Sequence, residues 1–112
     1  MYRVLKRDGV TVDFEISKIS GAIVKAFEAL NKNYHPSVIN MLALQVSADF
    51  ESKSKDDIIT VEDIQDSVEK VLSEAGFSDV AKAYILYRKQ REKIRNVGSA
   101  LLNYKDLVDN YL

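Results

Sequence analysis

The stretch YRVLKRDGVTVDFE, residues 2–15, decides the fold expected for this chain. Apolar and polar residues alternate from Val10 to Glu15, and Asp8-Gly9 is a dipeptide that favours tight turns. The pattern predicts a β-hairpin that turns at residues 6–9. Because two strands alone are only marginally stable in water, we expect the hairpin to pack on the rest of the chain and to act as a flap.

Two helices are predicted after the hairpin. Apolar residues recur at helical spacing over residues 17–30, where Ser17 is the expected N-cap, and again over residues 36–50. The second helix is apolar on more than one side, since Met41 and Leu44 lie off its main stripe. Such a helix is either central in the fold or presents a surface to a partner.

Two further helices and a tail complete the predicted order of elements. Thr60 is expected to cap a third helix that ends at Gly76, and a fourth begins near Ser78 and fades before Gly98. The last segment, Ala100 to Leu112, is rich in apolar residues, and residues 94–112 are expected to form a linker and helical tail. The expected class is α+β and mainly α: an N-terminal β-hairpin packed over a four-helix cluster, with an additional C-terminal helical tail.

Composition narrows the class of protein. The 112 residues suit one domain, and a net charge of −1 gives no overall attraction to nucleic acid or to a membrane. The absence of cysteine excludes disulfides and thiolate zinc sites, and the lone His35 makes a protein-bound metal improbable. No apolar run approaches the roughly 20 residues that span a bilayer, so a cytoplasmic protein is expected.

Cations gather at three places that suit an anion. Lys6 and Arg7 lie at the hairpin turn, where a glycine lets backbone N–H groups approach a phosphate. Lys18 lies near the start of the first helix, where the helix dipole already favours an anion. Arg88 and Arg91 share one face of the fourth helix, so these groups can together bind a triphosphate. A basic face paired with the acidic third helix is the alternative interpretation of the arginines.

Catalysis within this chain is not expected. There is neither a P-loop nor a Gly-x-Gly-x-x-Gly motif. The carboxylates of the predicted third helix look like exposed positions and cap acids, with no nucleophile or second base beside them: Glu62, Asp63, Asp66 and Glu69.

Four pieces of the chain, in order and with the expected gaps, resemble the ATP-cone family over residues 2–93: residues 4–9, 14–23, 60–65 and 80–91. The resemblance implies a hairpin over a four-helix bundle that binds ATP or dATP, with or without Mg²⁺, and reports their ratio to a distant catalytic domain. Residues 94–112 look like the linker toward the missing catalytic domain of an anaerobic ribonucleoside-triphosphate reductase, an oxidoreductase of deoxyribonucleotide synthesis.

The resemblance also implies roles for individual residues. Those that contact phosphates would be Lys6, Arg7, Lys18, Arg88 and Arg91. Those that shape the flap would be Asp8 and Gly9, and those that border the base would be Val12, Phe14, Glu15 and Ile16. Tyr84 and Thr60 are looser assignments, since Thr60 serves as a helix cap in any case. The implied partners are adenine nucleotides, the parent's catalytic domain and a second copy bound through helical surfaces.

Two other functions compete with this one. A related cone occurs fused to a zinc ribbon in a transcriptional repressor of ribonucleotide reductase genes, but this chain has no cysteine for such a ribbon. The other alternative is a cone that has lost its nucleotide site and serves only as a protein-interaction module.

Overall fold

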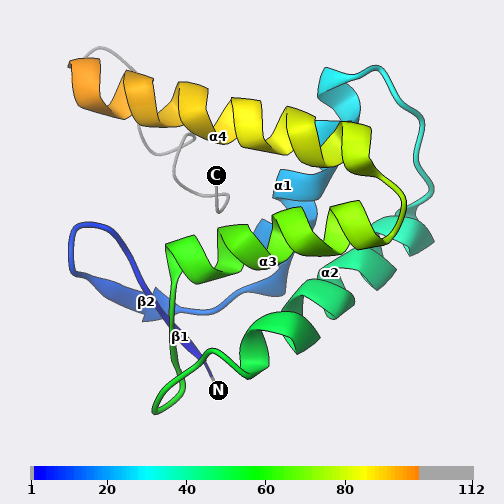
Figure 1. The fold of residues 1–112 in the computed structure, drawn as a ribbon. Helices are drawn as coiled ribbons and strands as arrows, with labels where there is room; N and C mark the ends of the chain where they lie inside the picture. Colours follow the sequence, from blue (N-terminus) through cyan, green and yellow to red (C-terminus); the bar gives the residue numbers. More distant parts are fainter. Residues whose placement is uncertain (1, 99–112) are drawn as a thin grey trace.

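Residues 2–98 are described by the computed structural model in Figure 1, with the backbone alone for residues 94–98. The elements in chain order are β1 (Arg3–Leu5), β2 (Thr11–Asp13), α1 (Ile16–Ala29), α2 (Pro36–Glu51), β3 (Ile58–Thr60), α3 (Val61–Glu74) and α4 (Ser78–Gly98). The mainly helical α+β class is therefore confirmed. The predicted helical tail falls largely on residues 99–112, which lie outside the described residues.

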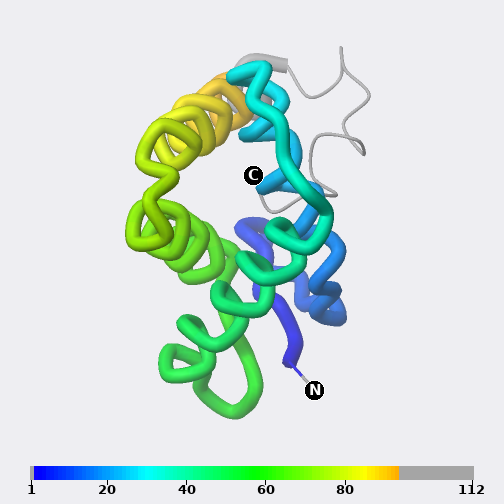
Figure 2. The backbone as a smooth tube through the Cα atoms, turned by 90° about the vertical axis from the view of Figure 1, so that its right-hand side faces the viewer, coloured from blue at the N-terminus to red at the C-terminus, as the bar shows by residue number. Residues whose placement is uncertain are grey.

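The four helices enclose one core. Each packs on two others, α1 on α2 and α4, and α3 on α2 and α4, so that the chain runs round a common centre (Figure 2). The apolar stripes expected from the sequence supply most of that centre, including Ile23, Val46, Val68 and the aromatic Phe27. Leu30 is the exception among the predicted stripe positions, because it follows the end of α1 and is 41% exposed.

The hairpin is joined by a third strand, β3, and the sequence did not predict this strand. The strand order is β2-β1-β3, with β1 antiparallel to β2 and parallel to β3. Val4 pairs with Val12 on one side and Ile59 on the other, and both Val4 and Ile59 are buried. β3 is only three residues long and follows a polar loop, so its own sequence gives little indication of a strand. It becomes a strand by parallel pairing with β1, which is distant in the chain. The sheet links the hairpin directly to the start of α3.

The hairpin turn forms where the sequence predicted it. The Lys6 N–H donates to the Val10 carbonyl at 2.9 Å, and the Gly9 N–H donates to the Lys6 carbonyl at 3.0 Å. Gly9 adopts a φ of +88°, which a glycine accepts without steric cost, and Asp8 Oδ1 accepts the Val10 N–H. The turn therefore presents Arg7 and Asp8 at its tip.

The N-cap predicted for the first helix is wrong. The helix starts at Ile16, and its N-cap is Glu15, which has extended backbone and makes no side-chain capping bond. The reason is that the Phe14 N–H is still paired with the Tyr2 carbonyl, so the chain passes from sheet to helix within one residue. Ser17 is already inside the helix.

The other helix ends mostly agree with the sequence. The Thr60 hydroxyl accepts the Asp63 N–H at 3.1 Å, and Gly76 follows the end of α3 with a φ of +90°. His35 caps α2 by accepting the Ser37 N–H on Nδ1. The expected fading of α4 before Gly98 is wrong, since the helix includes that residue. Within the described part of the chain, none of the helices is long and apolar enough to cross a membrane.

Candidate functional site

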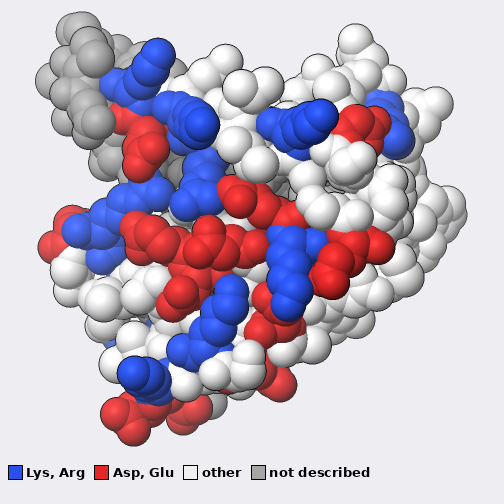
Figure 3. Space-filling view, in the orientation of Figure 1, with Lys and Arg blue, Asp and Glu red and all other residues white. Residues whose placement is uncertain are grey.

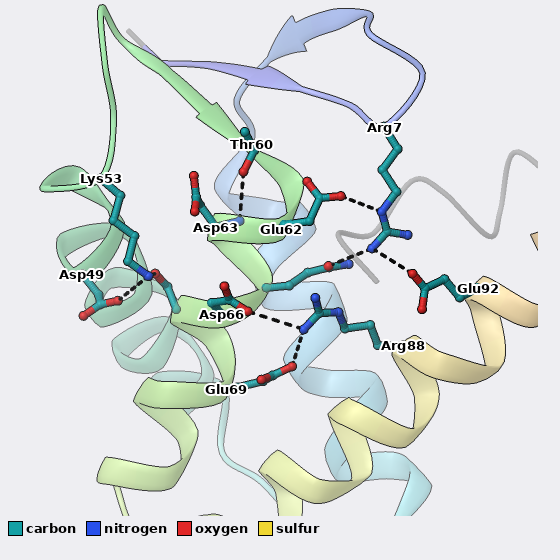
Figure 4. Close-up of polar contacts among 12 residues, drawn as sticks. Arg7, Asp49, Lys53, Thr60, Glu62, Asp63, Asp66, Glu69, Arg88 and Glu92 are labelled. Carbon is teal, nitrogen blue, oxygen red and sulfur yellow. Dashed lines mark hydrogen bonds and ion pairs between the residues drawn. The ribbon is translucent and has the colours of Figure 1, made fainter.

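Arg7 reaches from the hairpin turn onto α3. Its Nε donates to Glu62 Oε1 at 2.7 Å, and its Nη2 donates to Gln65 Oε1 at 3.0 Å (Figure 4). The same Nη2 lies 3.9 Å from Glu92 Oε1 on α4. Gln65 is fully buried, so its amide oxygen is a fixed acceptor for the guanidinium. These contacts hold the tip of the hairpin against the first turns of α3.

Arg88 reaches the same face of α3 from α4 (Figure 4). Its Nη1 donates to Glu69 Oε1 and lies 3.8 Å from Asp66 Oδ1. The Arg88 and Glu69 side chains are only 21% and 26% exposed. A charge-assisted hydrogen bond that is partly shielded from water is stronger than one at an open surface. Helices α3 and α4 run antiparallel (Figure 1), and the contacts of Arg88 with Asp66 and Glu69 lie near the middle of α3.

These contacts form two adjacent sets, one around Arg7 and one around Arg88, at the junction of the hairpin, α3 and α4, and together they are called the ion-pair cluster. Its members are Arg7, Glu62, Gln65, Asp66, Glu69, Arg88 and Glu92. On the face shown in Figure 3, carboxylates run across the middle of the molecule with cationic side chains around them. Two of the predicted phosphate residues, Arg7 and Arg88, are thus brought to one helix.

From the sequence, the acidic members of the cluster look like exposed positions and cap acids, which underestimates their contacts with the arginines. The structure shows the pairing of Arg88 with the acidic third helix that was the alternative interpretation of the arginines. Glu62 and Glu69 are not simply exposed helix positions, since each is hydrogen-bonded to an arginine. Residues 62, 65, 66 and 69 are spaced to share one helix face, which is the signal that could have found them.

The electrostatics of the cluster keep Glu62 ionised. Partial desolvation acts to raise the pKa of the Glu62 carboxyl, but the hydrogen bond and charge of Arg7, with the charge of Arg88, hold that pKa below its ordinary value. The carboxylate therefore stays negative over the physiological range and remains a partner for Arg7.

Tyr84 lies beneath the cluster rather than at its surface. Its side chain is fully buried, and burial raises the pKa of its hydroxyl above the ordinary value. The opposing charges of Arg88 and Glu69 also act on it, so the hydroxyl is close to the cluster. In this conformation Tyr84 packs the core under Arg88 and offers no surface to a ligand.

The remaining predicted cations occupy different surroundings. Lys18 Nζ lies 3.7 Å from Glu15 Oε2 at the start of α1. Arg91 is 5% exposed, with its guanidinium 4.4 Å from the centre of the Tyr87 ring and hydrogen-bonded to the Tyr87 hydroxyl. Among the described residues, none forms an ion pair with the Lys6 side chain. The contacts of Lys18 with Glu15 and of Arg91 with Tyr87 involve no member of the ion-pair cluster.

The residues assigned to the base lie along β2 and the start of α1. Val12 is partly buried against the core, whereas Ile16 is 39% exposed. Phe14 belongs to an aromatic group, with its ring centre 6.4 Å from that of Tyr2 and 5.4 Å from that of Phe50, both edge to face. Phe14 therefore anchors the hairpin to α2.

The apolar surface expected on α2 is present. Met41 is 45% and Leu44 is 63% exposed. Both line a groove with Ser37, Asn40, Gln45 and Ala48. For metals, the described residues contain no group of three or more histidine or acidic side chains placed to hold an ion.

The comparisons with known proteins agree with this architecture. Residues 2–93 match the family described as ATP cone domain, and the chain belongs to that family. It is 44% identical over 98 residues to the ribonucleoside-diphosphate reductase subunit alpha of Chlamydia pneumoniae, a match that spans 82% of the chain and 9% of that protein.

Relatives of other reductase types match as well. A vitamin B12-dependent ribonucleoside-diphosphate reductase of Thermoplasma acidophilum is 43% identical over 92% of the chain and 13% of its own length. An anaerobic ribonucleoside-triphosphate reductase of Haemophilus influenzae is 33% identical over 89% of the chain and 14% of its own length. The chain thus spans only a small part of these relatives, and the family occurs in reductases of several types.

Proposed function

We propose that this chain is the adenine-nucleotide-binding regulatory domain of a ribonucleotide reductase. The nucleotide's phosphates would bind at the junction of the hairpin, α3 and α4. The observation that carries the proposal is the meeting of Arg7 and Arg88, from elements far apart in the sequence, at one face of α3. Membership of the ATP-cone family supports adenine nucleotides as the ligand.

Guanidinium groups suit phosphate because their planar donors match two oxygens at once. Lys6 follows β1 directly and adds a flexible positive charge beside Arg7. Lys18 lies in the first turn of α1, whose N-cap side chain makes no capping bond, so backbone donors there favour an anion. Arg91 completes the proposed set from α4. Asp8 and Gly9 would shape the flap that closes over the phosphates.

The base would lie against the hairpin and the start of α1. Val12 and Ile16 offer partly exposed apolar surface, and Phe14 and Glu15 lie between them in the chain. Thr60 and Tyr84 would act from below, Thr60 by fixing the start of α3 and Tyr84 by supporting Arg88. These assignments rest on the family resemblance and on the position of each residue.

Discrimination between ATP and dATP needs more than one contact. The two nucleotides differ by one 2′-hydroxyl, and a hydrogen bond contributes only about 0.5–1.5 kcal/mol net. Regulation therefore requires that each nucleotide favours a different conformation or assembly, since a ligand bound equally by two states shifts neither. The exposed α2 surface around Met41 and Leu44 is the proposed site of contact with a second copy or with the catalytic domain.

The type of parent enzyme is the finer part of the proposal. The resemblance of the tail favours an anaerobic ribonucleoside-triphosphate reductase, and the Haemophilus influenzae relative supports this. The second candidate is a ribonucleoside-diphosphate reductase, favoured by the higher identities of 44% and 43% to such enzymes. A glycyl-radical loop in any sequence that follows Leu112 in the gene would identify the anaerobic type, because such a loop occurs only there.

Calorimetric titration with ATP, dATP and GTP tests the proposed function. We expect both adenine nucleotides to bind more tightly than GTP, and Lys6→Ala to weaken ATP binding severalfold. The matched control is Lys82→Ala, which removes the same charge from an exposed position on α4. Absence of binding at millimolar nucleotide would refute the proposal. Light scattering that shows assembly independent of nucleotide would favour an interaction module instead.

A further inference from the structure

The two arginines proposed to bind phosphate already hold carboxylates of this chain. Arg7 Nε is bonded to Glu62 and Arg88 Nη1 to Glu69 (Figure 4). A carboxylate and a phosphate both accept from the same N–H groups of a guanidinium. A nucleotide phosphate therefore cannot use these donors until the carboxylates leave them.

Each pair also joins two separate elements. The bond from Arg7 to Glu62 ties the hairpin turn to the first turn of α3, and the bond from Arg88 to Glu69 ties α4 to the middle of α3. Both acids lie on the one face of α3 that the hairpin and α4 share. Loss of the two bonds would remove these polar ties to the hairpin turn and to α4 at the same time, while the pairing of β1 with β3 and the packing of α3 on α4 would remain.

We infer that Glu62 and Glu69 compete internally with the nucleotide's phosphates, occupying Arg7 and Arg88 in the free domain and giving them up on binding. The inference rests on the proposed function, because it takes these arginines as the phosphate ligands. Nucleotide affinity then depends on how much more stable the arginine–phosphate pairs of the complex are than the arginine–carboxylate pairs of the free domain. The freed carboxylates leave α3 with a net negative face, which repositions the hairpin and α4 and carries the signal.

A different role for the same acids predicts the opposite result. Acids that only orient the arginines for phosphate would make binding weaker when neutralised, because the arginine side chains would lose their fixed positions. Acids that compete make binding tighter when neutralised. The sign of the change in affinity therefore separates positioning from competition.

The test compares Glu62→Gln and Glu69→Gln with the wild type in calorimetric titrations with ATP. Glutamine keeps the shape of the side chain and removes its charge. We expect each variant to bind ATP about three- to tenfold more tightly, as fits the loss of one partly shielded ion pair. The control, Glu74→Gln, removes the same charge at the far end of α3 and should change affinity by less than about twofold.

Each outcome has a defined meaning. Unchanged or weaker binding by both glutamine variants, with a wild type that binds, would overturn the competition and leave the proposed function standing. Failure of the wild type and all variants to bind ATP would overturn both. Thermal unfolding of each variant checks the fold; should Glu69→Gln fail to fold, Glu62→Gln decides the matter, since the Glu62 side chain is 47% exposed and is tolerant of change.

Discussion

Arg7 Nε lies 2.7 Å from Glu62 Oε1, although the two residues are 55 positions apart in the chain. This contact fixes the tip of the hairpin on α3, next to the point where Arg88 arrives from α4. The turn is thereby held over a helix that has both acidic residues and cationic neighbours.

Arg88 is the residue of α4 on which we expect nucleotide binding to depend. Arg88→Ala should weaken ATP binding by about tenfold or more, because one guanidinium–phosphate interaction is lost. Arg88→Lys should recover only part of that loss, since an ammonium lacks the planar pair of donors. The measurement is calorimetric titration. Lys89→Ala, an exposed neighbour on the same helix, is the control, and an equal effect of both alanine variants would reject the assignment.

Gly9 is expected to stabilise the flap through its backbone alone. Gly9→Ala should lower the free energy of unfolding by about 1 kcal/mol, because the φ of +88° is unfavourable for a residue with a Cβ. A Cβ at this position would meet no atom within 4 Å, so a steric clash adds nothing to that cost. Gly9→Asn should cost less, since asparagine tolerates this conformation better. Urea unfolding measures both. A loss for asparagine as large as for alanine would indicate that the cost is not conformational.

Substitution of Thr60 distinguishes a role as the N-cap of α3 from a direct contact with the nucleotide. Thr60→Ala should destabilise the domain by about 1 kcal/mol, because the Asp63 N–H loses its acceptor. Thr60→Ser keeps the hydroxyl and should stay within about 0.5 kcal/mol of the wild type. Urea unfolding gives both values. An alanine variant with wild-type stability and weaker ATP binding would instead identify Thr60 as a direct ligand contact.

Asp49 should make the stability of the domain depend on pH in the acid range. Hydrogen bonds from Ser67 and Lys70 hold the pKa of the Asp49 carboxyl below its ordinary value. Partial desolvation acts in the opposite direction but is outweighed. The unfolded chain therefore binds this proton more readily than the folded one, and the stabilisation is present above about pH 4 and is lost as pH falls through the lowered pKa.

The matching measurement is urea unfolding of wild type and Asp49→Asn at pH 7 and pH 3. At pH 7 the wild type should be more stable by roughly 1–2 kcal/mol, since the Asp49 side chain is only 17% exposed and is bonded to Lys70 at 3.0 Å. The difference should shrink at pH 3. A difference that is the same at both pH values would contradict the role of the Asp49 charge.

The sequence predicted those parts of the fold that depend on neighbours in the chain. The turn at Asp8-Gly9, the cap at Thr60 and the apolar stripe of α3 each follow from local spacing. The third strand did not follow, because Ile59 is a strand residue only in the presence of Val4. Ser17 failed as a cap for a similar reason, since the hairpin's pairing decides where α1 begins.

The candidate site shows the same division. Its cations could be named from the sequence, because Arg7 and Arg88 stand in recognisable positions. The spacing of Glu62 and Glu69 marks an acidic helix face, but which arginine each acid pairs with depends on the packing of α3 against the hairpin and α4. The burial of Tyr84 likewise depends on how α3 and α4 meet.

The central claim is that adenine nucleotides bind where the hairpin, α3 and α4 meet, and NMR titration of the labelled chain with ATP tests it most directly. We expect the largest shifts at residues 6–9, at the first half of α3 and at the Nε–Hε signals of Arg7 and Arg88. Amides of α2 that face away from this junction, such as Leu44, should change little. Shifts that centre on α2, or no shifts at millimolar ATP, would contradict the claim.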